Sequence, residues 1–237
     1  MAKIKSKSED VRKALRKYAD KEKAKVLRGF FKTKPGEYGE GDIFLGVTVP
    51  LIRNIVKQFK DLPLGDLKRL LHSKIHEERL LALLILVEQF NQADINAKEK
   101  IYKTYLANTK FINNWDLVDL SAPQIAGGFL INKDRRALYK LAQSPLLWDR
   151  RIAILSTFAF IKANDFDDLF RLTKLLLLDK EDLIHKACGW MLREAGKRNL
   201  RSEENFLRQH FKVMPRTMLR YAIERFPENK RRAYLKG

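Results

Sequence analysis

The feature that most constrains the fold is a short pattern that recurs about every 35 residues. In it, a cation precedes small and apolar residues early in a predicted helix. The pattern begins at Arg79, Arg151, Lys186 and Arg220, with separations of 72, 35 and 34 residues. One period fits all four positions if a further repeat falls near Trp115. Helix pairs that repeat at this period are typical of an α-solenoid, in which each pair buries its apolar face against its neighbours.

Helical periodicity extends through nearly the whole chain, and no segment alternates apolar and polar residues over the length of a strand. Ser8, Asp20 and Thr48 are predicted helix N-caps. Pro123 is expected to kink or split the helix that contains it. The sequence predicts an all-α protein, one domain over residues 1–237, with helices over 8–18, 20–31, 48–60, 64–72, 75–91, 95–108, 114–131, 134–143, 146–162, 165–178, 181–198, 202–212 and 215–226.

The charge of the chain indicates a polyanionic partner. There are 48 Lys and Arg residues against 29 Asp and Glu, a net charge of +19 that is spread along the chain. Counterion release then supplies much of the affinity for nucleic acid. If one cation from each repeat lines the inner face of a solenoid, that face is concave and basic, which suits duplex DNA. A solvated basic surface without a specific partner is the alternative. A membrane surface is disfavoured because no single helix stands out as a basic amphipathic anchor.

Cysteine use and hydropathy favour a cytoplasmic protein. Cys188 is the only cysteine, so no intrachain disulfide can form, and it is expected to be buried and inert. The N-terminal residues contain no apolar signal core. The longest strongly apolar run, Leu80 to Val87, is too short to cross a bilayer.

Two other candidate sites are weak. The glycine-rich segment 35–42 has acidic residues between its glycines and no Gly-Lys-Ser/Thr ending, so we interpret it as a connector and not a phosphate-binding loop. His72 and His76 are four residues apart, but Ser73-Lys74 marks a break between helices. We expect a pair of surface histidines, and no metal or cofactor is implied.

The tryptophans are more informative. In a helix, Trp115 and Asp119 share one face, which places an aromatic ring beside a carboxylate. Trp115, Trp148 and Trp190 lie near the starts of successive recurring helices. Each ring either packs in the core or faces a ligand, and Trp148 is the one that we expect in the core.

The sequence resembles the AlkD family of DNA alkylation repair glycosylases, which are built of HEAT-like helical repeats. The resemblance covers about residues 30–225. It implies a right-handed solenoid of HEAT-like repeats with a concave basic surface. It is carried by Phe44-Leu45-Gly46-Val47-Thr48-Val49-Pro50, by Trp115-Asp116-Leu117-Val118-Asp119, by Trp148-Asp149-Arg150-Arg151-Ile152-Ala153-Ile154-Leu155 and by Lys186-Ala187-Cys188-Gly189-Trp190-Met191-Leu192-Arg193-Glu194.

The resemblance assigns roles residue by residue. The catalytic carboxylate falls on Asp119 and its aromatic partners on Trp115 and Trp190. The DNA-contacting arginine falls on Arg151. Further DNA contacts are expected from Arg150, Lys186 and Thr48, although the family often has Gln where this chain has Thr48. An aromatic contribution from the second helix falls on Phe30 or Phe31.

The resemblance implies excision of cationic N3- and N7-alkylated purines from duplex DNA. Separately, the protein is expected to be monomeric, although the sequence does not decide its oligomeric state. Asp119 would stabilise an oxocarbenium-like deoxyribose, and the charged base would leave without a protonating acid. We expect Trp115, Asp119, Arg151 and Trp190 to meet on the concave surface. Two alternatives are a non-enzymatic helical-repeat protein that binds branched or damaged DNA or RNA, and a protein-binding solenoid scaffold. The sequence does not rank 3-methyladenine, 7-methylguanine and bulkier cationic adducts as substrates.

Overall fold

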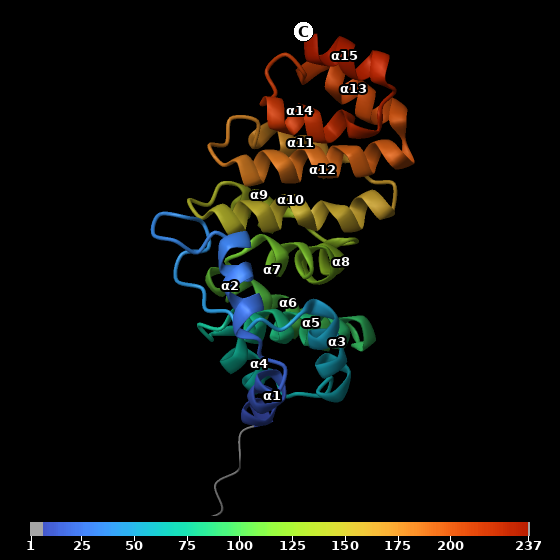
Figure 1. Cartoon of the computed structure of the whole chain (residues 1–237). Helices are drawn as coiled ribbons and strands as arrows, with labels where there is room; N and C mark the ends of the chain where they lie inside the picture. The colour runs from blue at the N-terminus through green and yellow to red at the C-terminus, as the bar shows by residue number, and fades with distance from the viewer. Residues whose placement is uncertain (1–6, 237) are drawn as a thin grey trace, which may run out of the picture. The chain divides into compact units, whose positions relative to one another are not determined.

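The computed structural model describes residues 7–236, and this part of the chain is helical throughout (Figure 1). Its only β-type pairing is an isolated bridge between Ile43 and Ile75. The chain divides into two compact units, with the boundary between Ser121 and Ala122. The all-α prediction is confirmed, whereas the single domain predicted for residues 1–237 stays a prediction.

The first unit contains seven α-helices in its described part, with a 3₁₀ turn before the last. These are α1 (Lys7–Arg16), α2 (Lys21–Phe30), α3 (Val49–Gln58), α4 (Leu64–Leu71), α5 (His76–Gln92), α6 (Ile95–Leu106), the 3₁₀ turn Thr109–Phe111 and α7 (Trp115–Asp119).

Helix α5 organises this unit. It packs against α1, α3, α4, α6 and α7, and every residue from His76 to Leu86 is buried. A helix surrounded on all sides needs apolar residues all round. This requirement accounts for the apolar run that begins at Leu80.

The second unit contains a π-helical turn followed by α-helices. These are the turn Pro123–Gly127, α8 (Gly128–Leu130), α9 (Arg136–Ala142), α10 (Leu147–Lys162), α11 (Asp167–Leu175), α12 (Asp182–Arg198), α13 (Leu200–His210), α14 (Arg216–Ala222), the 3₁₀ turn Ile223–Arg225 and α15 (Glu228–Lys236).

Successive helix pairs stack within the second unit. Helix α9 packs against α10, α11 against α12, and α12 in turn packs against both α10 and α14 (Figure 1). The recurring cations Arg151, Lys186 and Arg220 are each the fifth residue of α10, α12 and α14. The sequence period therefore corresponds to a structural repeat, as in an α-solenoid. The curvature and the concave basic face predicted for the chain stay predictions.

Close helix packing in this stack requires a glycine at position 189. A Cβ atom there would lie 2.4 Å from the Met218 carbonyl oxygen and 2.5 Å from Cβ of Tyr221. Any larger side chain would therefore push α12 and α14 apart. The neighbouring Cys188 is fully buried, as expected, and burial raises the pKa of its thiol.

The observed helix N-termini agree in part with the N-caps predicted from the sequence. Asp20 caps α2 by accepting hydrogen bonds from the backbone N–H groups of Glu22 and Lys23, both at 3.0 Å. Thr48 is at the N-cap position of α3, as predicted, but its side chain makes no capping hydrogen bond. Ser8 is not an N-cap, because α1 already includes Lys7.

The helix predicted over 114–131 is broken, as Pro123 indicated. Helix α7 ends at Asp119, and Pro123 opens the π-helical turn that follows. Proline has no N–H to donate to the carbonyl four residues earlier, so the helix cannot continue in regular form. Within the described range 7–236, no helix is long and apolar enough to cross a membrane.

Candidate functional site

Helix α7 presents an aromatic ring and a carboxylate one turn apart. Trp115 and Asp119 are its first and last residues, and both are partly exposed. The three residues between them, Asp116, Leu117 and Val118, are buried. Asp119 is therefore partly accessible, as the predicted catalytic role requires. Its role in a reaction stays a prediction.

The Trp115 ring lies against two phenylalanines from the end of α2. Phe31 stacks on it with ring centroids 5.2 Å apart, and Phe30 meets it edge-on at 5.8 Å. Phe31 is only 7% exposed and belongs to the apolar cluster with Ala24 and Phe44. Phe30 is 60% exposed. Of the two candidates on this helix, Phe30 is the ring that can contact an external ligand.

The first turn of α5 forms a buried charged centre. The expectation that His72 and His76 are a pair of surface histidines is therefore wrong for His76. His76 is 2% exposed. Its Nδ1 lies 2.9 Å from Asp42 Oδ2, and its Nε2 lies 2.8 Å from Asp116 Oδ2. His72 is indeed exposed, with Nε2 2.6 Å from Asn108 Oδ1. The spacing of four residues could not reveal His76's partners, because they lie 34 and 40 residues away.

Arg79 completes this centre and does not lie on the surface. Its Nη2 donates to Asp42 Oδ1 at 2.6 Å and its Nη1 to the Ser73 carbonyl at 2.9 Å. The idea that the cation of each repeat lines an exposed surface is therefore wrong for Arg79, because a buried guanidinium here neutralises a buried carboxylate. Burial opposes ionisation of Asp42, but its hydrogen bond to His76 and the charge of Arg79 lower its pKa.

Glu77 holds the loop that precedes α3. Its carboxylate accepts hydrogen bonds from the backbone N–H groups of Leu45, Gly46 and Val47, at distances from 2.8 to 3.2 Å. Gly46 has φ of +85°, and a Cβ there would lie 2.1 Å from the Asp20 carbonyl oxygen. Glycine is required at this contact, which brings the loop against the start of α2. The exposed Thr48 follows directly.

The adjacent arginines of α10 are both engaged within the second unit. Arg151 is 5% exposed, and its Nη1 donates to the Leu183 carbonyl at 2.6 Å. Arg150 binds Asp179 through two nitrogens, at 2.6 and 3.1 Å, and donates to the Ser144 carbonyl at 3.0 Å. These contacts give Arg150 a structural role in joining α10 to the loop before α12, which is unfavourable for the expected DNA contact.

Helix α12 carries the more accessible candidates. The Lys186 side chain is 39% exposed and pairs with Asp182 at 2.9 Å. Trp190 is partly exposed, and its Nε1 donates to Glu194 Oε1 at 3.2 Å. Trp148, expected in the core, is only partly buried. Trp115 and Asp119 belong to the first unit, whereas Arg151 and Trp190 belong to the second, and their convergence on one surface stays a prediction.

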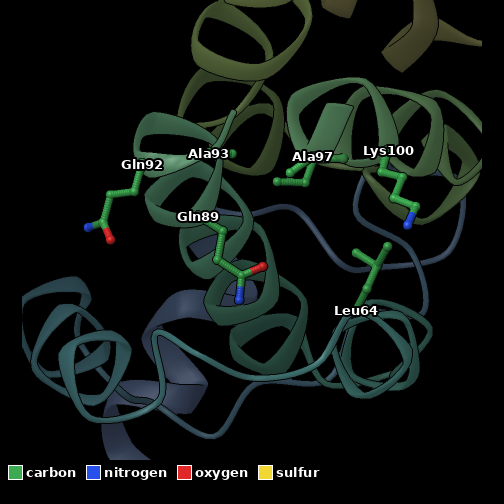
Figure 2. Close-up of a pocket in the computed structure, with 7 residues that line it drawn as sticks. Leu64, Gln89, Gln92, Ala93, Ala97 and Lys100 are labelled. Carbon is green, nitrogen blue, oxygen red and sulfur yellow. The ribbon is translucent and has the colours of Figure 1, made fainter. Parts of the chain in front are cut away.

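A shallow pocket in the first unit lies apart from these residues. It has a volume of about 330 Å³ and is lined by residues of α4, α5, α6 and the turn between the last two (Figure 2). Its polar lining consists of Gln89, Gln92 and Lys100. Without a carboxylate or histidine, this lining provides no acid–base pair. Over residues 7–236, no cluster of three or more His, Cys, Asp or Glu side chains could hold a metal ion.

The comparison with known proteins gives the family. The family model described as "DNA alkylation repair enzyme" matches residues 11–226. A solved structure, a predicted DNA alkylation repair enzyme from Enterococcus faecalis, has the same fold with a TM-score of 0.67 at 17% sequence identity. The match covers 89% of this chain and 97% of that one. No curated protein matches the sequence. The family match spans nearly the whole chain, and the chain therefore belongs to the DNA alkylation repair enzyme family.

Proposed function

We propose that this protein is a DNA glycosylase that removes cationic N3- and N7-alkylated purines from duplex DNA. The observation that carries the proposal is helix α7, which exposes Trp115 and Asp119 one turn apart above a buried core. Membership of the repair family and the net charge of +19 support DNA as the substrate.

The proposed chemistry needs a carboxylate and no protonating acid. Alkylation at N3 or N7 makes the purine cationic, so the glycosidic electron pair leaves with the base and neutralises it. Positive charge then develops on the deoxyribose at C1′. The Asp119 carboxylate stabilises this centre and orients the water that attacks it. The water oxygen bonds to C1′, and its proton passes to the carboxylate or to solvent.

Aromatic rings supply the second part of the proposed site, beside the carboxylate. The Trp115 face and the exposed Phe30 ring, whose centroids are 5.8 Å apart, offer an aromatic surface to the cationic nucleotide. A cation–π contact contributes about 0.5–2 kcal/mol. We assign a similar role to Trp190, whose partial exposure permits such a contact. Phe31 supports the Trp115 ring from within the core.

Phosphate contacts set the register of the DNA backbone. We propose Arg151, Lys186 and Thr48 for this role. Arg151 is 5% exposed and its Nη1 donates to the Leu183 carbonyl, so its guanidinium binds a phosphate only by exchanging this carbonyl for a phosphate oxygen. The accessible ammonium group of Lys186 adds a second positive charge on the neighbouring helix α12.

A base-release assay on methylated duplex DNA tests the proposal, with Asp119→Asn as the comparison. Release of 7-methylguanine by the wild type, strongly reduced in the variant, supports it. Tight duplex binding without release of any base would instead identify a non-enzymatic DNA-binding protein. Weak and salt-insensitive DNA binding would point to a protein-binding scaffold.

A further inference from the structure

Helix α7 is too short to hold its own geometry. It has five residues, a little more than one turn, and isolated helices of this length are unstable in water. The direction of the Trp115 and Asp119 side chains must therefore be set by contacts to other elements. Asn114 caps the helix by accepting from the Trp115 N–H at 2.8 Å, and α5 packs directly against it.

A side-chain hydrogen bond from His76 to Asp116 joins α5 to α7. Asp116 accepts from the Leu117 N–H through Oδ1 at 2.9 Å and faces His76 Nε2 through Oδ2 at 2.8 Å. One carboxylate thus joins the backbone of α7 to α5. The opposite ring nitrogen is bound to Asp42, which Arg79 also holds. The imidazole is fixed at both ends.

The same ring supports Trp115 by a second route. Phe44 stacks on His76 with centroids 4.6 Å apart, and Phe31 lies 4.9 Å away. Phe31 in turn stacks on Trp115 at 5.2 Å. A displacement of His76 would therefore reach α7 both through Asp116 and through the aromatic stack.

Both carboxylates require a donor, so both nitrogens of His76 must carry a proton. Burial opposes this charge, but the hydrogen bonds to Asp116 and Asp42 outweigh it and raise the pKa of His76. Two carboxylates then face two cations, His76 and Arg79, and the buried centre is neutral. The other two acidic residues in the first turn of α5 have partners other than His76. Glu77 accepts from the backbone amides of residues 45–47, and Glu78 binds Arg12.

We propose that His76 is a positioning residue for the excision reaction: by binding Asp42 and Asp116 together, it fixes where α7 places Asp119 and Trp115. This inference rests on the proposed glycosylase function. His76 is buried beneath the aromatic cluster and does not itself touch DNA. It acts on the reaction only through α7.

The first test replaces His76 by Gln. Glutamine donates from a single nitrogen and cannot reach carboxylates on the two opposite sides of the imidazole position, so the link between Asp42 and Asp116 is broken. We expect the single-turnover rate of base release to fall by about 10- to 100-fold, since a displacement of about 1 Å in a catalytic group costs this much. Affinity for undamaged duplex DNA should stay within about twofold. His72→Gln is the matched control, because it changes a histidine of the same unit that lies outside this network, and it should keep the wild-type rate.

A pH profile separates positioning from general loss of stability. In the wild type, the rate of base release should fall at alkaline pH as His76 loses its second proton, and this limb should be absent in His76→Gln. A His76→Gln enzyme with the wild-type rate and the wild-type profile would overturn the inference. Absence of base release by the wild type would overturn the proposed function itself, so the two failures are distinguishable.

NMR of the wild type provides a test that depends on neither variant folding nor activity. ¹⁵N-labelled protein should show that the His76 ring keeps both of its nitrogen protons to a higher pH than an ordinary histidine, whose pKa is 6.5. The Leu117 amide, which is bound to Asp116, should shift together with the titration of this ring. A His76 ring that loses a proton at or below pH 6.5, or a Leu117 amide that does not follow its titration, would overturn the inference.

Discussion

Replacing Glu77 by Gln should destabilise the first unit by about 2–4 kcal/mol. Glu77 is 2% exposed and accepts from three consecutive backbone amides between 2.8 and 3.2 Å. Net stabilisation is about 1.5–3 kcal/mol for a hydrogen bond to a charged group and about 0.5–1.5 kcal/mol for a neutral one. Losing the charge across three bonds therefore costs about 3 kcal/mol. The amide NH₂ of Gln would also face N–H groups that need an acceptor.

Urea denaturation at pH 7 measures this change, and hydrogen exchange of the Gly46 amide locates it. We expect a lower midpoint and faster exchange at Gly46, since its acceptor is weakened. Glu88→Gln is the matched control on the same helix. Its partner is the side-chain amide of Gln92, so the change should stay under about 0.5 kcal/mol. A Glu77→Gln protein within about 1 kcal/mol of wild type, with Gly46 still protected, would refute the reasoning.

Three further predictions concern single side chains. Burial raises the pKa of Glu203 to about 8 from an ordinary 4.5, so the folded state binds the proton more tightly than the unfolded state. Stability should therefore fall as pH rises from about 4.5 to about 8. Thermal melts of Glu203→Gln should not show this dependence on pH. Arg151→Ala should weaken DNA binding and lower the salt dependence by about one phosphate, whereas Arg150→Ala, which removes the Asp179 ion pair, should lower the melting temperature without changing the salt slope. Phe30→Ala should reduce affinity for methylated DNA while leaving stability nearly unchanged. Phe31→Ala should lower the free energy of unfolding by about 3 kcal/mol or more in urea denaturation. Equal effects of the two variants would contradict the assignment of Phe30 to the DNA contact and of Phe31 to the core.

Local and periodic features of the fold could be predicted from the sequence. The recurring cation predicted a repeat, and it occupies the same position in α10, α12 and α14. The break at Pro123 and the cap at Asp20 were also predictable, because each depends on residues within one helical turn. The pattern could not show which faces are buried. Arg79 and Arg151 match Lys186 in the sequence repeat, yet both arginines are buried.

Long-range contacts could not be predicted from one sequence. From the sequence, the four successive residues from His76 to Arg79 are expected to form an exposed, polar first turn of a helix. In the structure each of them is buried against a partner far along the chain. Nothing near His76 in the sequence identifies Asp42 or Asp116 as its partners. For α7, helical spacing correctly placed Trp115 and Asp119 one turn apart in a helix, and both are partly exposed. It gave no indication of the charged centre that supports this helix.

The most direct test of the central claim is single-turnover release of 7-methylguanine from duplex DNA by the wild type and by Asp119→Asn. Asn keeps the size of the side chain and removes its charge. Loss of one preorganised electrostatic group in an active site typically lowers the rate about 100- to 1000-fold. We therefore expect a decrease of this size with duplex affinity unchanged. Release by Asp119→Asn at the wild-type rate would contradict it.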